Sequence, residues 1–193
     1  MIEFSFRYLR VWLDEIGQSD RCKDIIAELN HRFRENGVGY EFNYEANEIV
    51  RIDNQVLHQE AIRPAIHLLA DPTYKTANEE YLAALEDYKK GDLGDCLTKC
   101  CSSLESVMKI ICDKKGWQHD PKAKTGPLLK IVLPKLGLPP FFEQPLIVIA
   151  SMRHTLSPSH GAGTKERRVD EYMARYALNA SGSAIVLLVE AAS

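Results

Sequence analysis

The sequence of 193 residues lacks the features that mark several large classes of protein. No apolar run approaches the roughly 18 residues that a membrane-spanning helix requires, which argues against an integral membrane protein. Residues 1–16 are apolar but include five charged side chains, so they do not resemble a signal peptide. Internal repeats and low-complexity segments are also missing. We therefore expect a globular protein of the cytoplasm.

Cysteine is present but has no regular arrangement. The five cysteines are an odd set at irregular spacing, and they contain no Cys-x2-Cys pair (Cys22, Cys96, Cys100, Cys101 and Cys112). Such a set does not predict a disulfide framework, and the missing pair argues against a structural zinc site. We expect free thiols that are buried or half-buried on helices.

An excess of positive charge is also lacking, because the net charge is −3. This balance argues against broad, sequence-independent binding of nucleic acid. The charge is unevenly spread, however. Residues 107–135 hold seven lysines against two aspartates, a local balance of +5 (Lys109, Lys114, Lys115, Lys122, Lys124, Lys130 and Lys135). A local basic field of this kind suits a confined anionic substrate, although a solvated polar face would look the same.

Hydrophobic periodicity predicts a mainly α protein. Helices are expected at residues 3–17, 19–36, 54–70, 75–90, 93–115, 125–136, 141–156 and 168–190. Two short alternating runs, residues 40–43 and 48–52, flank a polar turn and predict a β-hairpin. The pair Asp71-Pro72 marks a break, because the residue before a proline avoids helical geometry. We therefore predict a small α+β section over residues 1–72 and a bundle of four to five helices over residues 73–193.

Within the predicted helix 141–156, an arginine shares a face with apolar residues. Leu146, Ile149, Ala150 and Arg153 fall on one side of a helical wheel. A guanidinium on an apolar stripe is costly unless it is paired or functional. Arg153 is thus either a helix-terminal side chain that caps or pairs, or part of a site.

A histidine follows this arginine closely. Pro158 ends or kinks the helix, and His160 stands next to Gly161 in a glycine-rich loop that can turn back toward Arg153. Histidine can move a proton near neutral pH, and the arginine fork fits a phosphate. The pair therefore suits cleavage of an RNA phosphodiester, although the spacing by itself is a weak pattern.

The segment Arg153 to His160, RHTLSPSH, resembles the Arg-x4–6-His signature of the HEPN superfamily. The first intervening position is usually polar in that superfamily, and here it is His154; Gly161 after the histidine also matches. The order of the remaining landmarks over residues 75–190 is similar to the abortive-infection C-terminal branch: LESVMK at 104–109, Gly116-Trp117, Leu128-Leu129 and Tyr176-Ala177-Leu178. Residues 39–42 and 48–52 resemble the region often joined to this domain in phage-defence proteins.

The resemblance implies a HEPN-like helical bundle and a metal-independent endoribonuclease that needs no cofactor. His160 would be the general acid or base, Arg153 would stabilise the phosphate, and His154 and Glu105 would support them. Two motifs would meet across a homodimer interface made by the bundle helices. An antitoxin or another defence-system protein is an expected partner. Side chains expected to bind RNA are Lys109, Lys124, Arg167 and Arg168.

Several alternatives stay open at this stage. Glu105 shares a helix face with Thr98, Ser102 and Lys109, so it is either a solvated charge or a carboxylate that orients Arg153 or His160. His154 either touches substrate or caps the helix end. The main alternative to an enzyme is a non-catalytic HEPN module that dimerises and binds nucleotide, RNA or a partner protein.

Overall fold

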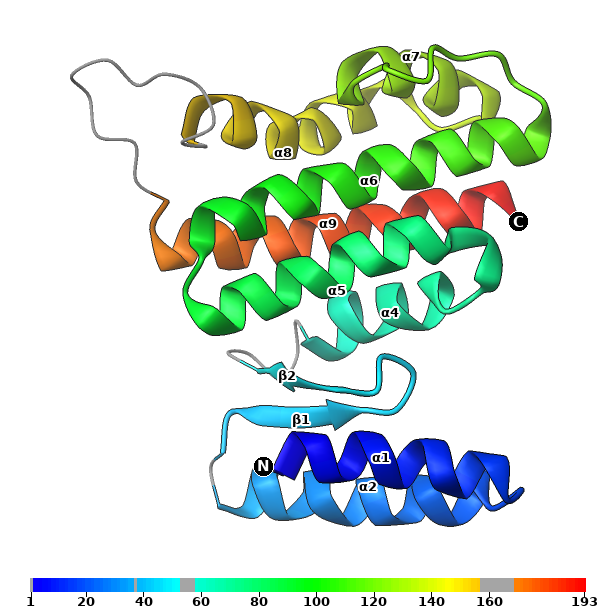
Figure 1. The fold of residues 1–193 in the computed structure, drawn as a ribbon. Coiled ribbons are helices and arrows are strands. Elements are labelled where there is room, and N and C mark those ends of the chain that lie inside the picture. Colours follow the sequence, from blue (N-terminus) through cyan, green and yellow to red (C-terminus); the bar gives the residue numbers. More distant parts are fainter. Residues whose placement is uncertain (1, 37, 53–57, 157–168) are drawn as a thin grey trace. The chain divides into compact units, whose positions relative to one another are not determined.

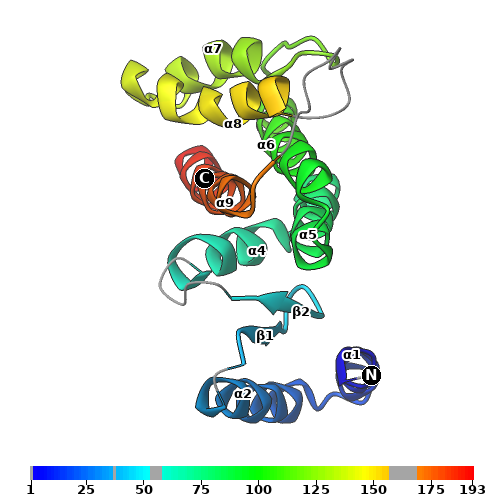
Figure 2. The same ribbon diagram turned by 90° about the vertical axis from the view of Figure 1, so that its left-hand side faces the viewer.

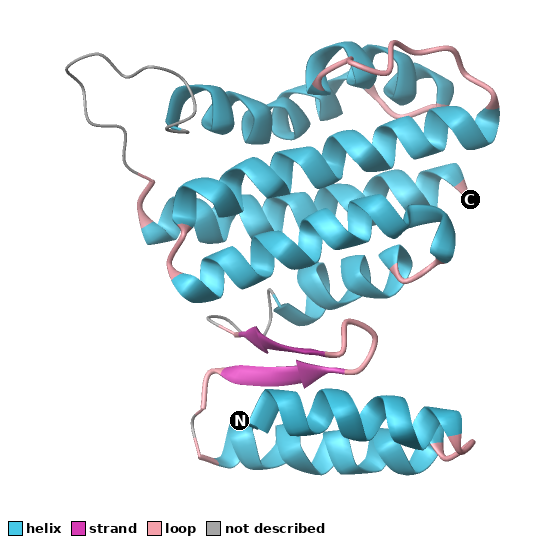
Figure 3. Cartoon of the chain, in the orientation of Figure 1, coloured by secondary structure: helices cyan, strands magenta, loops and turns pink. Residues whose placement is uncertain are grey.

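The computed structural model describes residues 2–36, 38–52, 58–156 and 169–193. It divides into two compact units, an amino-terminal unit (Met1–His58) and a bundle unit (Gln59–Ser193). The described chain is mainly helical, with one two-stranded antiparallel sheet, as Figure 3 shows by colour. None of the described helices is both long enough and apolar enough to cross a membrane.

The amino-terminal unit consists of two helices and the predicted hairpin. Helices α1 (Ile2–Glu15) and α2 (Ser19–Glu35) precede strands β1 (Tyr40–Asn43) and β2 (Glu48–Arg51). The strands are antiparallel, with Tyr40 opposite Arg51 and Asn43 opposite Glu48. Asn47, in the turn, has a φ of 55°, a left-handed conformation that asparagine tolerates better than most residues. The predicted helices and hairpin of this region are confirmed.

One small core holds this unit together. Leu13 of α1, Cys22 and Ile26 of α2, and Phe42 of β1 are buried in contact with one another. The side chain of Asn30 on α2 accepts a hydrogen bond from the Phe42 amide at 2.7 Å and donates one to its carbonyl at 2.9 Å. Because these are the groups that a neighbouring strand would pair, Asn30 takes the place of such a strand beside β1.

The bundle unit is built around one long helix. Helix α6 (Leu93–Lys115) packs against α5 (Lys75–Lys90), α7 (Thr125–Lys135), α8 (Glu143–Leu156) and α9 (Glu171–Ala192). Figures 1 and 2 show α5 on one side of α6 and the pair α7 and α8 on the other, with α9 alongside. This arrangement confirms the predicted bundle and its mainly α class.

The ends of these helices follow from their sequence. Gly91 ends α5 with a φ of 86°, and Gly116 ends α6 with a φ of 67°. Both are left-handed conformations that glycine adopts without steric cost, which is why a helix so often stops at one. Between them, the sequence predicts an apolar stripe along α6 at spacings of three and four. It is buried at Leu97, Cys100, Leu104, Val107 and Ile111 and half-buried at Leu93. All five cysteines are buried free thiols, as expected.

The division between the units differs from the predicted boundary after residue 72. A π-helical turn (His58–Ile62) leads into α4 (Arg63–Leu69), and α4 packs on α9 and α5. The bundle unit therefore begins at Gln59. A short 3-10 turn at Pro72–Tyr74 then joins α4 to α5, so Asp71-Pro72 interrupts a helix within the unit.

Candidate functional site

A buried carboxylate lies in the middle of α6, on the side that faces α7 and α8. The exposed fraction of Glu105 is 6%. Its Oε1 atom accepts two hydrogen bonds from Thr125, one from the backbone amide and one from the hydroxyl, each at 3.0 Å. The alternative of a solvated charge is therefore wrong. The face of α6 opposite its apolar stripe is covered by α7 and α8, so helices pack on both sides of α6.

The second oxygen of this carboxylate faces Arg153. Arg153 lies in the last turn of α8, and its Nη1 atom is 3.8 Å from Oε2 of Glu105. The separation is too long for a hydrogen bond but close enough for an ion pair. The Arg153 side chain retains 25% exposure against 8% for Glu105. Arg153 therefore pairs with a buried carboxylate, while a quarter of its own side chain remains exposed.

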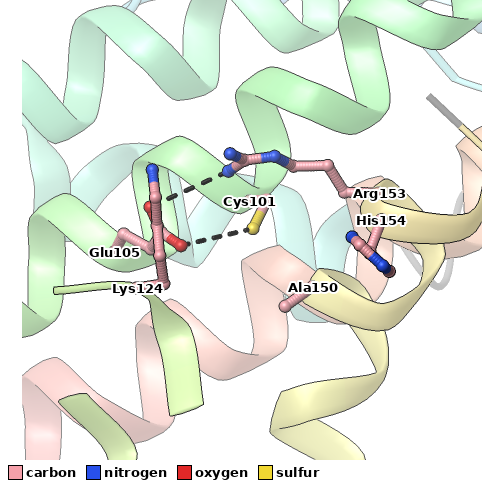
Figure 4. Close-up of a pocket in the computed structure, with 6 residues that line it drawn as sticks. All are labelled: Cys101, Glu105, Lys124, Ala150, Arg153 and His154. Atoms are coloured by element: carbon pink, nitrogen blue, oxygen red, sulfur yellow. Dashed lines mark hydrogen bonds and ion pairs between the residues drawn. The ribbon is translucent and has the colours of Figure 1, made fainter. Parts of the chain in front are cut away.

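These side chains border a pocket of about 360 Å³ (Figure 4). Its described lining comes from α6, α8 and the residue that precedes α7: Cys101, Glu105, Lys124, Ala150, Arg153 and His154. Figure 4 shows Arg153 extending from α8 toward Glu105 on α6. Two permanent cations, Lys124 and Arg153, thus border a pocket with one carboxylate, and the balance favours an anionic ligand.

The apolar face of α8 explains how Arg153 reaches this place. Leu146 and Ile149 are buried, with exposed fractions of 4% and 1%, and they fix α8 against the bundle. Arg153 follows Ile149 by four residues, so it lies on the same face one turn further on. The apolar stripe predicted for this helix is confirmed. This stripe places the guanidinium of Arg153 beside the carboxylate of Glu105 on α6.

Cys101 is a member of the pocket wall that the sequence did not single out. Burial is the main cause that raises the pKa of this thiol, and nearby Glu105 raises it further. The neutral thiol donates a hydrogen bond to Oε1 of Glu105 at 3.9 Å and lies 3.6 Å from the Thr125 hydroxyl. A raised pKa makes Cys101 a poor nucleophile. Its position one turn before Glu105 was the available signal.

The remaining predicted residues have different outcomes. Lys124 and His154 line the pocket, and both are exposed. Lys109 does not line it among the described residues; it is half-buried, and its positive charge opposes the burial that raises the pKa of Glu80. The predictions for His160, Arg167 and Arg168 lie outside the described residues.

Some lysines of the basic stretch have aromatic partners. Lys114 lies 5.5 Å from the ring centre of Tyr74, and Lys135 lies 5.2 Å from that of Trp117. Both distances are in the range of cation–π contacts. Among the described residues, no group of three or more His, Cys, Asp or Glu side chains is arranged to hold a metal ion.

Comparison with known proteins gives one result. Residues 75–192 match the family model Abi_C, described as a HEPN-like domain. No curated protein and no solved structure matches the chain. The matched residues are more than half of the sequence and cover α5 to α9. The chain therefore belongs to the Abi_C family of HEPN-like domains.

Proposed function

We propose that this protein is a metal-independent endoribonuclease and a toxin-like effector of phage defence by abortive infection. The observation that carries the proposal is Arg153, a partly exposed guanidinium braced by buried Glu105 at the wall of a pocket. His160 stands seven positions further along the chain. The family match supports the fold and the superfamily, and the chemistry rests on these side chains.

The proposed reaction uses the RNA as its own nucleophile. His160 takes the proton from a 2′-hydroxyl, and the 2′-oxygen attacks the adjacent phosphorus. The bond from phosphorus to the 5′-oxygen breaks, and that oxygen takes up a proton from water as it leaves. Arg153 stabilises the negative charge that grows on the phosphoryl oxygens. The products are a 2′,3′-cyclic phosphate and a 5′-hydroxyl.

The pocket residues fit supporting roles. The guanidinium has five N–H donors, and its 3.8 Å contact with Glu105 leaves several of them for a phosphate. Lys124 adds a second cation at the pocket wall. His154, on the same helix as Arg153, lies where it can contact the substrate. Arg167 and Arg168 extend the proposed contacts with RNA from the segment that follows His160.

We propose further that the working form is a homodimer, in which two copies of Arg153 and His160 share one cleft formed by the bundle helices. An antitoxin or another defence-system protein would restrain this activity. Mixing an Arg153→Ala protein with a His160→Ala protein tests the shared cleft. If each half-site takes its arginine and its histidine from different copies, the mixture regains cleavage that neither variant shows alone.

The direct test is cleavage of RNA by the purified protein in excess chelator. We expect wild type to produce cyclic phosphate ends, and we expect His160→Ala and Arg153→Ala to lose at least a hundredfold in rate. His31→Ala is a matched control, because His31 is exposed on α2 and pairs with Glu35 across one helical turn. RNA binding without cleavage, unchanged in His160→Ala, would instead support the non-catalytic module.

A further inference from the structure

The carboxylate of Glu105 divides its two oxygens between two partners. Oε1 accepts both hydrogen bonds from Thr125, whereas Oε2 faces the guanidinium of Arg153. A carboxylate that is free to rotate about its last bond would exchange these oxygens and vary its distance to Arg153. The two donors from one residue oppose that rotation. The orientation of the site arginine thus depends on what holds Oε1.

Thr125 is placed to hold it. It is the first residue of α7 and is fully buried. The side chain of the preceding residue, Lys124, does not cap the helix. The orphan amide at this helix start is satisfied by Glu105 from a different helix. The positive end of the α7 dipole also favours a carboxylate there. Of these two donors, the hydroxyl can be removed by a substitution that leaves the backbone unchanged.

We propose that the Thr125 hydroxyl positions Arg153 by fixing the Glu105 carboxylate; the proposal rests on the function proposed above for Arg153. Thr125 does not line the pocket among the described residues, so it acts through residues that do: mainly Glu105, and more weakly Cys101, which lies 3.6 Å from its hydroxyl. When the hydroxyl is removed, Oε1 keeps the amide and the weak Cys101 donor. The carboxylate then turns more freely, and the guanidinium loses its defined place.

The expected signature is a loss of transition-state stabilisation rather than of binding. Arg153 remains charged and close to the pocket, so the KM for RNA should change little. A donor displaced by about 1 Å from the developing charge can reduce the rate on the order of a hundredfold. We therefore expect Thr125→Val, which keeps the shape of the side chain, to lower kcat about tenfold to a hundredfold. Thr125→Ser should restore it, because serine keeps the hydroxyl.

Ser103→Ala is a matched control for the loss of a buried hydroxyl. Ser103 lies on α6, it is fully buried, and its hydroxyl donates to the Ala77 carbonyl at 2.8 Å. This bond has no part in the Glu105 contacts. Thr125→Val and Ser103→Ala should both lower the melting temperature, but only Thr125→Val should lower kcat. An equal loss of kcat in both folded variants would overturn the proposal, since it would reflect general destabilisation.

A second readout does not depend on cleavage. In ¹⁵N-detected NMR, the side-chain Nε–H signal of Arg153, assigned with Arg153→Lys, should shift and broaden in Thr125→Val and return to the wild-type position in Thr125→Ser. An unchanged signal would overturn the proposal. If Thr125→Val does not fold, Thr125→Ala removes the same hydroxyl with a smaller side chain. If wild type cuts no RNA, the proposed function fails, whereas the NMR signal still decides whether Thr125 positions Arg153.

Discussion

On one side of α6 the bundle packs small and apolar groups in close contact, and on the other side it surrounds a carboxylate. Between α5 and α9, Tyr81 is fully buried and its hydroxyl donates to the Leu178 carbonyl at 3.1 Å. On the side of α6 that faces α7 and α8, the buried Glu105 contacts Thr125, Arg153 and Cys101 beside an open pocket. The same helix therefore packs closely against α5 and α9 on one side and holds an oriented carboxylate on the other.

The two sides should therefore tolerate different kinds of substitution. Close packing has no room for added volume, so the α5–α9 side should respond through stability. A buried polar network is sensitive to the loss of one member, so the α7–α8 side should respond through activity. Substitutions on each side of α6 test this separation.

The largest effect is expected for Glu105→Gln. The amide keeps an oxygen that can accept from Thr125, but it cannot pair electrostatically with Arg153. We expect RNA cleavage to fall on the order of a hundredfold, measured as kcat/KM. Stability should change much less, because Arg153 is partly exposed. Glu79→Gln is the control, since Glu79 is an exposed glutamate on α5 that pairs with Lys75; an equal loss of cleavage there would contradict the prediction.

Gly182→Ala should act through stability alone. A Cβ added at Gly182 would lie 2.6 Å from the Tyr81 hydroxyl and 2.9 Å from the Ala61 carbonyl oxygen. Since backbone cannot move aside cheaply, we expect a loss of about 1–3 kcal/mol in the free energy of unfolding. Urea denaturation measures it, with Ser183→Ala, the next and exposed position of α9, as the control. A folded Gly182→Ala protein with normal stability but lost cleavage would break the proposed separation.

Lys124→Ala should weaken the binding of RNA. Lys124 is exposed and lines the pocket, so its removal should raise the Kd for an uncleavable 2′-deoxy substrate about tenfold at low salt. The slope of log Kd against log salt should fall by about one phosphate contact. Lys130→Ala is the control, because Lys130 is exposed on α7 in the same basic stretch but does not line the described pocket. Equal losses in both variants would indicate a diffuse basic field.

The positions of the helices could be predicted from the sequence more fully than the contacts between them. The stripe of α6 and the glycines after α5 and α6 follow from local rules, and the structure confirms them. The attachment of α4 to the bundle depends on contacts with α9, which no local pattern reveals. For this reason the break at Asp71-Pro72 suggested a domain boundary, although the compact unit continues back to Gln59.

The candidate site could be predicted only where it depends on the pattern of a single helix. Arg153 could be singled out because it follows an apolar stripe on its own helix. The burial of Glu105 could not be predicted from the sequence, because it depends on α7 and α8, which cover this side of α6. Thr125 gave still less signal. Its role follows only from the tertiary position of the α7 start against Glu105.

The smallest effect is expected for Glu80→Gln, which tests whether the two sides of α6 are electrostatically separate. Glu80 lies on α5, and its Oε2 atom is buried without a hydrogen-bond partner among the described residues. Burial is the main cause that raises the pKa of this carboxyl, and the charges of Glu105 and Glu79 raise it further; the Ser106 hydrogen bond and Lys109 oppose them. The folded state therefore binds this proton more tightly than the unfolded state does.

This difference sets the direction of the pH dependence. The contribution of Glu80 is fully present below the unfolded pKa, and it is lost as pH rises through the raised pKa of the folded state. Above that range, Glu80→Gln should be more stable than wild type, by less than about 1 kcal/mol because the group is partly solvated. Urea denaturation between about pH 4 and pH 8 measures the effect, with Glu190→Gln on the exposed side of α9 as the control. The gain should be smaller when Glu80→Gln is made in a Glu105→Gln background, because the charge of Glu105 contributes to the raised pKa of Glu80. Equal gains in both backgrounds would contradict this and show that the two sides of α6 are electrostatically independent.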